Sequence, residues 1–153
     1  MKNTQRNKDN IDEKVDKKNN LLIYIIEKEA VISNSLKKDI NNYIISEYED
    51  QKFKKINIEN TIIKEEEILK KFQEKKPSFV IIDMFLNDYF DGIKIAKALR
   101  DQKYINPIIF LNNYGTGNGF PKDEINEISG PYEIIDKPIH YEKLHEIIDN
   151  ILN

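Results

Sequence analysis

Three short stretches of the chain are apolar at every position, whereas the segments between them are apolar only at some positions. The continuous stretches are Leu21–Ile26, Phe79–Ile82 and Ile108–Leu111. Continuous runs of this length are typical of strands that are covered on both faces, as in a parallel sheet. Residues 53–58 and 132–135 are weaker strand candidates. The pattern therefore predicts five strands in the interior of the protein.

Apolar residues recur at helical spacing in the segments that follow the predicted strands. Three glutamates, Glu65–Glu67, precede the second of these patterns and suit the positive N-terminal end of a helix. Pro121 suits the first turn of a shorter fourth helix. A β-α unit repeated five times, with right-handed crossovers, places helices on both faces of a five-stranded parallel sheet. The predicted helices lie around residues 32–44, 68–72, 93–99, 121–128 and 141–151.

The N-terminal segment differs from the rest of the chain. In residues 1–20 only Met1, Ile11 and Val15 are apolar, and charges of both signs are mixed throughout. Such a segment buries too little surface to offset the entropy of ordering it. We therefore expect a disordered tail over residues 1–20 and one folded domain over residues 21–153.

Composition excludes several classes of function. The chain has no cysteine, which excludes disulfides, thiolate catalysis and Cys-based zinc sites. It has only two histidines, His140 and His145, too few for a multi-histidine metal site. A net charge of −3 provides no strong field for nucleic acid or an anionic membrane. There is no membrane-length apolar run and no apolar signal-peptide core. We expect a cytoplasmic protein that binds neither nucleic acid nor a membrane.

Charged and polar residues follow the predicted strands at their carboxyl ends. Glu27 and Lys28 follow the first strand, Asp83 ends the third, Asn112 ends the fourth, and Lys137 follows the fifth. Ligands of open parallel sheets bind beyond these strand ends. The sequence therefore predicts that carboxylates and a lysine far apart along the chain share one cleft.

Four segments, in this order and on these strand ends, resemble the receiver domains of two-component response regulators. The resemblance covers residues 21–153. It implies an α/β fold of the flavodoxin-like (βα)5 kind, also called CheY-like, with strand order 2-1-3-4-5. The segments are Pro77–Leu86, Asp91–Arg100, Asn106–Leu111 and Gly130–Pro138.

The resemblance also implies roles for residues at the strand ends. Asp83 would accept a phosphoryl group, Lys137 would pair with that group, and Asn112 lies at the position that binds it on activation. Mg²⁺ would be held by Glu27, Asp83 and the backbone carbonyl of Phe85. The phosphoryl donor would be a histidine kinase or phosphotransfer protein. Output would pass to a downstream protein partner.

Three positions depart from the pattern of the family. Lys28 stands beside Glu27 where receiver domains carry a second acid, and an ammonium cannot coordinate a cation. Glu29 is the nearest acid that could take its place. Asn112 stands where the family has Thr or Ser, and Ile134 stands where many members have an aromatic ring. The site is therefore degenerate relative to the family.

These observations predict a single-domain receiver in a phosphorelay, a signalling module rather than an enzyme, acting as a monomer or weak dimer. The alternative is a phosphorylation-independent pseudo-receiver in which Lys28 replaces the metal ion. A flavin or nucleotide binder with the same fold would need a glycine-containing phosphate loop after the first strand. Residues 27–30 contain no glycine, which disfavours that function.

Overall fold

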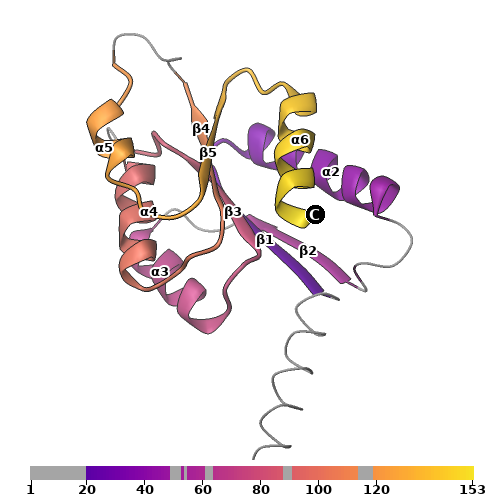
Figure 1. Ribbon diagram of the computed structural model, residues 1–153, viewed down its shortest axis with the longest axis horizontal. Coiled ribbons are helices and arrows are strands. Elements are labelled where there is room, and N and C mark those ends of the chain that lie inside the picture. The colour runs from indigo at the N-terminus through magenta and orange to yellow at the C-terminus, as the bar shows by residue number, and fades with distance from the viewer. Residues whose placement is uncertain (1–19, 49–52, 54, 61–63, 88–90, 114–118) are drawn as a thin grey trace, which may run out of the picture.

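Five parallel strands form one sheet in the order β2-β1-β3-β4-β5, as the computed structural model shows (Figure 1). The flavodoxin-like strand order predicted from the sequence is therefore confirmed. The structure describes residues 20–48, 53, 55–60, 64–87, 91–113 and 119–153. The strands are β1 (Asn20–Ile26), β2 (Lys55–Asn60), β3 (Phe79–Asp83), β4 (Ile108–Asn112) and β5 (Tyr132–Asp136).

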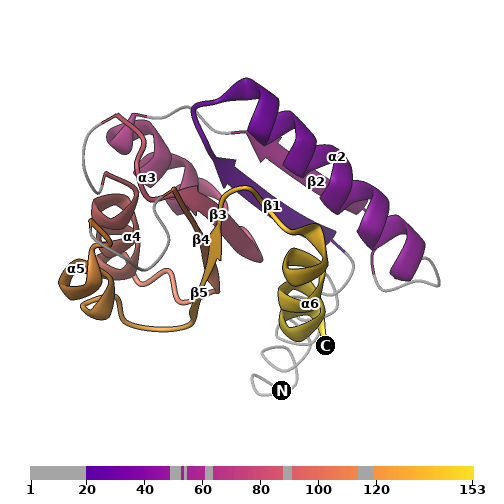
Figure 2. The same ribbon diagram turned by 90° about the horizontal axis from the view of Figure 1, so that it is seen from above.

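Helices cover both faces of the sheet, so that the domain has three layers (Figures 1 and 2). Helices α2 (Ala30–Glu47) and α6 (Tyr141–Leu152) lie on one face. The other face is covered by α3 (Glu65–Glu74), α4 (Asp91–Asp101) and α5 (Lys122–Asn126). Within the described part of the chain, no helix is both long enough and apolar enough to cross a bilayer.

The central strands β1, β3 and β4 are apolar over most of their length because each of them contributes side chains to two hydrophobic cores. In β3, Phe79 and Ile81 pack in the core beneath α2 and α6, whereas Val80 and Ile82 pack in the core beneath α3, α4 and α5. All four side chains are fully buried. Successive side chains of a strand point to opposite faces, so both faces of β3 must be apolar. The same alternation assigns Asp83, the last residue of β3, to the α2 and α6 face.

The sequence placed two boundaries slightly differently from the structure. Strand β2 was predicted over residues 53–58 but runs from Lys55 to Asn60. It is an edge strand, and its register is set by pairing with β1, in which Asn20 lies opposite Lys55. Asn20 therefore belongs to β1 and not to the predicted tail. The remainder of that prediction, residues 1–19, lies outside the described residues.

Candidate functional site

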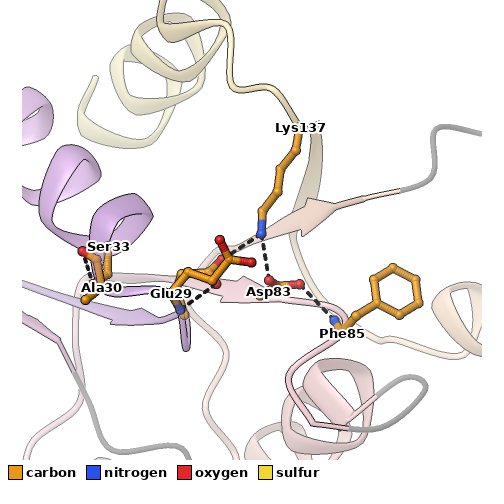
Figure 3. Close-up of polar contacts among 7 residues, drawn as sticks. Glu29, Ala30, Ser33, Asp83, Phe85 and Lys137 are labelled. Carbon is orange, nitrogen blue, oxygen red and sulfur yellow. Dashed lines mark hydrogen bonds and ion pairs between the residues drawn. The ribbon is translucent and has the colours of Figure 1, made fainter.

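Three charged side chains from three strand ends meet at the carboxyl edge of the sheet (Figure 3). Glu27 directly follows β1, Asp83 ends β3, and Lys137 directly follows β5. The Lys137 ammonium donates to Asp83 Oδ2 at 2.7 Å and to Glu27 Oε2 at 2.9 Å. Strand β4 lies between β3 and β5, so the long lysine side chain reaches past the end of β4 to make these contacts. The structure thus brings together three of the residues that the sequence assigned to one cleft.

The two carboxylates are almost completely withdrawn from water. The side chains of Glu27 and Asp83 are 0% and 2% exposed, and that of Lys137 is 14% exposed. Their other oxygens are also bonded, because Asp83 Oδ1 accepts the Phe85 N–H at 2.8 Å and Glu27 Oε1 accepts the Glu29 N–H at 3.1 Å. Buried charges are tolerated when they are paired and hydrogen-bonded in this way. The site is therefore a buried group of charged side chains that are hydrogen-bonded to one another and to the backbone at the carboxyl edge of the sheet.

The charges of this group are unevenly balanced, with one ammonium against two carboxylates. Burial raises the pKa of Glu27 above its ordinary value, and the neighbouring Asp83 raises it further, against the opposite effects of Lys137 and the Glu29 N–H. For Lys137, burial alone would lower the pKa. The hydrogen bonds to Asp83 and Glu27 outweigh burial and hold that pKa above its ordinary value. Lys137 consequently stays protonated and is the cation that compensates the two buried carboxyl groups.

Helix α4 supports the segment that carries Asp83. The Gly92 N–H donates to the Met84 carbonyl at 3.1 Å. A Cβ atom at Gly92 would lie 1.9 Å from the Asp83 carbonyl oxygen, so no residue larger than glycine fits without moving the backbone. Asp91 Oδ2 accepts the Asn87 N–H at 3.2 Å and so helps to close the loop before the helix. The Asp91-Gly92 pair therefore holds the end of β3 against α4.

Asn112 ends β4, the strand between Asp83 and Lys137, but its side chain is bonded to a different acid. It is fully buried, and its side-chain Nδ2 donates to Asp136 Oδ1 at 2.9 Å across the β4–β5 pair. Its backbone carbonyl accepts the Lys137 N–H at 2.8 Å. The sequence placed Asp136 at the carboxyl end of the last strand, with Lys137 and Pro138, but did not predict its bond to Asn112, because that strand was expected to end at Ile135. Extending that strand by one residue would have placed Asp136 opposite Asn112.

The structure does not bring Lys28 into the site. Lys28 is exposed, and it forms no ion pair with either Glu27 or Asp83. Glu27 continues the strand alternation of Ile23 and Ile25 toward the α2 and α6 face, and the residue after it turns outward. The cation between the two carboxylates is Lys137. The expectation that Lys28 occupies the place of a metal ion therefore needs correction.

The oxygen donors at the strand ends provide part of what Mg²⁺ requires. Among the described residues, no group of three or more His, Cys, Asp or Glu side chains is placed to hold a metal. Mg²⁺ nevertheless often takes only one or two carboxylates, with waters and phosphate oxygens completing its shell. Glu27 and Asp83 fit this smaller donor set, because they place two carboxyl groups side by side around one cation. The Phe85 carbonyl, the third predicted ligand, belongs to the residue whose N–H already binds Asp83.

Known structures with a similar fold are signalling receivers. The alignment with a two-component response regulator from Clostridium difficile covers 86% of this chain and 95% of that protein's chain, with a TM-score of 0.66 and 22% sequence identity. The alignment with the chemotaxis protein CheY4 of Vibrio cholerae covers 86% of this chain and 98% of that one, with a TM-score of 0.65 and 16% sequence identity. The alignment with the signal receiver domain of a modulated diguanylate cyclase from Desulfovibrio desulfuricans G20 covers 86% of this chain and 92% of that one, with a TM-score of 0.65 and 18% sequence identity. The chain has the CheY-like fold of response-regulator receiver domains.

Sequence comparison gives a shorter match. The chain is 44% identical over 46 residues to the alkaline phosphatase synthesis transcriptional regulatory protein PhoP of Bacillus subtilis (strain 168). This match spans 30% of the chain and 19% of that regulator. No protein-family model matches the sequence.

Proposed function

We propose that the chain is a response-regulator receiver in a two-component phosphorelay and that Asp83 is its phosphoacceptor. The observation that carries the proposal is the ammonium of Lys137, which lies 2.7 Å from Asp83 Oδ2 at the carboxyl edge of the sheet. The receiver fold supports the same function. The phosphoryl donor would be a histidine kinase or phosphotransfer protein of the cytoplasm, and output would pass through contact with another protein.

The proposed reaction is attack of a carboxylate on phosphorus. With acetyl phosphate as donor, an Asp83 oxygen forms the new bond to phosphorus, the bond from phosphorus to the acetyl oxygen breaks, and acetate leaves with the electron pair. The Phe85 N–H donates to Asp83 Oδ1 and so fixes the orientation of the carboxylate. The Lys137 ammonium offsets the charge of the phosphoryl oxygens at the strand ends. No proton has to be removed from Asp83, because an ionised carboxylate is itself the nucleophile.

We further propose that Glu27 and Asp83, together with the Phe85 carbonyl, hold Mg²⁺. When bound, this ion would neutralise charge on the transferred phosphoryl group. Its binding is tested separately from phosphorylation, by thermal unfolding with and without Mg²⁺. We expect Mg²⁺ to raise the melting temperature of the wild-type protein and to have less effect on Glu27→Gln. Equal shifts in the two proteins would place the ion elsewhere.

The test of the function is an intact-mass measurement after incubation with acetyl phosphate and Mg²⁺. The wild-type protein should gain the mass of one phosphoryl group, and Asp83→Asn should gain none. Asp101→Asn is the matched control, because it makes the same substitution at an exposed residue at the end of α4. It should be modified as fully as the wild type. An adduct on Asp83→Asn would contradict the assignment of the phosphoacceptor.

A second candidate is an interaction module that works without phosphorylation. The observation that favours it is that Lys137 already pairs with both buried carboxylates, so the site is compensated without a metal ion. In this module Lys137, not Lys28, would have the role of the cation. Absence of an adduct in folded wild-type protein, together with no effect of Mg²⁺ on its melting temperature, would favour this candidate over the first.

A further inference from the structure

The pair formed by Asn112 and Asp136 lies on the opposite face of the sheet from the phosphoacceptor. By strand alternation, Asn112 shares the face of Phe110, which packs in the core beneath α3, α4 and α5. Asp83 shares the face of Ile81, which packs in the core beneath α2 and α6. The bond from Asn112 to Asp136 therefore holds the amide nitrogen at the β4–β5 pair and not at Asp83.

The chemistry of the acceptor fixes the orientation of this amide. An ionised carboxylate only accepts hydrogen bonds, so the Asn112 side chain must present nitrogen, not oxygen, to Asp136. Hydrogen bonds to a charged acceptor are shorter and stronger than neutral ones. Asn112 is fully buried, whereas Asp136 is exposed. A surface carboxylate thus controls the direction of a buried donor at the edge of the site.

We propose that Asp136 is a positioning residue, which holds the Asn112 amide in the unphosphorylated protein and releases it when Asp83 is phosphorylated. This inference rests on the proposed function of Asp83. The phosphoryl group carries more negative charge than a carboxylate and has three acceptor oxygens, so it competes for the same N–H group. Transfer of the amide from Asp136 to the phosphoryl group would free the Asp136 carboxylate at the surface. The two positions of the amide are then the two states of the switch.

The residues present at neighbouring positions agree with this assignment. Receiver domains commonly use a hydroxyl at the position of Asn112 and an aromatic ring at the position of Ile134. Ile134 is half-buried against the core beneath α3, α4 and α5, and its side chain has no polar group. The hydrogen-bonded pair of Asn112 and Asp136 therefore supplies a polar element at the β4–β5 edge that Ile134 cannot provide.

The proposal is tested with beryllofluoride and Mg²⁺, which imitate the phosphoryl group, on the full chain and on three variants. Asp136→Ala removes the acceptor, whereas Asp136→Asn removes its charge but keeps an oxygen. Glu133→Ala is the matched control, because it removes an exposed carboxylate from the same strand. Affinity is measured by titration, and the side-chain amide signals of Asn112 are followed by NMR.

We expect Asp136→Ala to bind beryllofluoride about ten-fold more tightly than the wild type, which corresponds to about 1.4 kcal/mol. The affinity of Asp136→Asn for beryllofluoride should be closer to that of the wild type, and the affinity of Glu133→Ala should equal that of the wild type. The Asn112 amide signals should shift in wild-type protein when beryllofluoride binds, and in Asp136→Ala before it is added. Equal affinity of Asp136→Ala and Glu133→Ala would overturn the inference, as would equal affinity of Asp136→Ala and Asp136→Asn. If the wild type binds no beryllofluoride, the proposed function fails and the inference fails with it.

Discussion

Replacing Lys137 with methionine removes the ammonium from between two buried carboxylates and keeps most of the apolar length of the side chain. The Glu27 and Asp83 side chains are 0% and 2% exposed, so water does not replace the lost partner. Removing one member of a buried ion pair typically costs about 3–5 kcal/mol, because an uncompensated charge stays buried. Two such carboxylates remain here, so we expect the free energy of unfolding to fall by about that amount at pH 7.

The loss should depend on pH in a defined direction. Without Lys137, burial and the neighbouring Asp83 still raise the pKa of Glu27 in the folded protein above its ordinary value, and the opposing effect of the lysine is gone. A carboxyl group with a raised pKa in the folded state stabilises that state at low pH, and this contribution is lost as the pH rises through the raised value. The deficit of Lys137→Met relative to the wild type should therefore be largest at neutral pH and should shrink toward pH 4.5, the ordinary value for glutamate.

Urea unfolding followed by circular dichroism measures this effect at each pH. Lys97→Met is the matched control, since Lys97 forms an ion pair with Glu127 in which both side chains are substantially exposed. Exposed pairs contribute about 0–1 kcal/mol, and the control should lose no more than this. If Lys137→Met is destabilised no more than Lys97→Met, the ion pairs of Lys137 with Glu27 and Asp83 do not stabilise the fold as expected.

Three further predictions concern stability. Gly92→Ala should cost about 1–3 kcal/mol in urea unfolding, because its Cβ meets the Asp83 carbonyl oxygen, and an unchanged midpoint would contradict this packing. Arg100→Lys should lower the free energy of unfolding by about 1–3 kcal/mol, because Arg100 donates to four backbone carbonyls that a lysine cannot reach together. A smaller loss than that of Lys97→Met would argue against this role of Arg100. The stability advantage of the wild type over Lys137→Met should narrow above pH 10.5. Because the pKa of Lys137 is raised in the folded state, its protonation stabilises that state fully below pH 10.5, and this stabilisation is lost as the pH rises through the pKa of the folded protein. A difference in unfolding free energy between the two proteins that stays constant up to pH 12 would refute this prediction.

Much of the fold could be predicted from the sequence because the central strands are covered on both faces. The runs at Leu21–Ile26, Phe79–Ile82 and Ile108–Leu111 have no polar residue, and each lies within an observed central strand. Strand β2 was shifted by two residues. An edge strand has fewer constraints, and polar residues such as Asn57 and Glu59 interrupt its apolar pattern. The placement of Asp83 and Lys137 at the same edge of the sheet follows from parallel strands, since their carboxyl ends share one edge.

The sequence could not decide which lysine pairs with the carboxylates. Lys28 and Lys137 both follow strands at the same edge, and only the direction of each side chain separates them. That direction depends on where the alternation of β1 stops, which a run of apolar residues does not reveal. The bond from Asn112 to Asp136 was missed for a related reason, because it depends on the register of β4 and β5 at their last residues.

The most direct test of the account is to locate the phosphoryl group after incubation with acetyl phosphate and Mg²⁺, by tandem mass spectrometry of peptides prepared under acidic conditions. The account predicts that the modification lies on Asp83 in wild-type protein and is reduced in Lys137→Met that is still folded. A phosphoryl group on any other residue, or equal modification of Asp83 with and without the lysine, would contradict it.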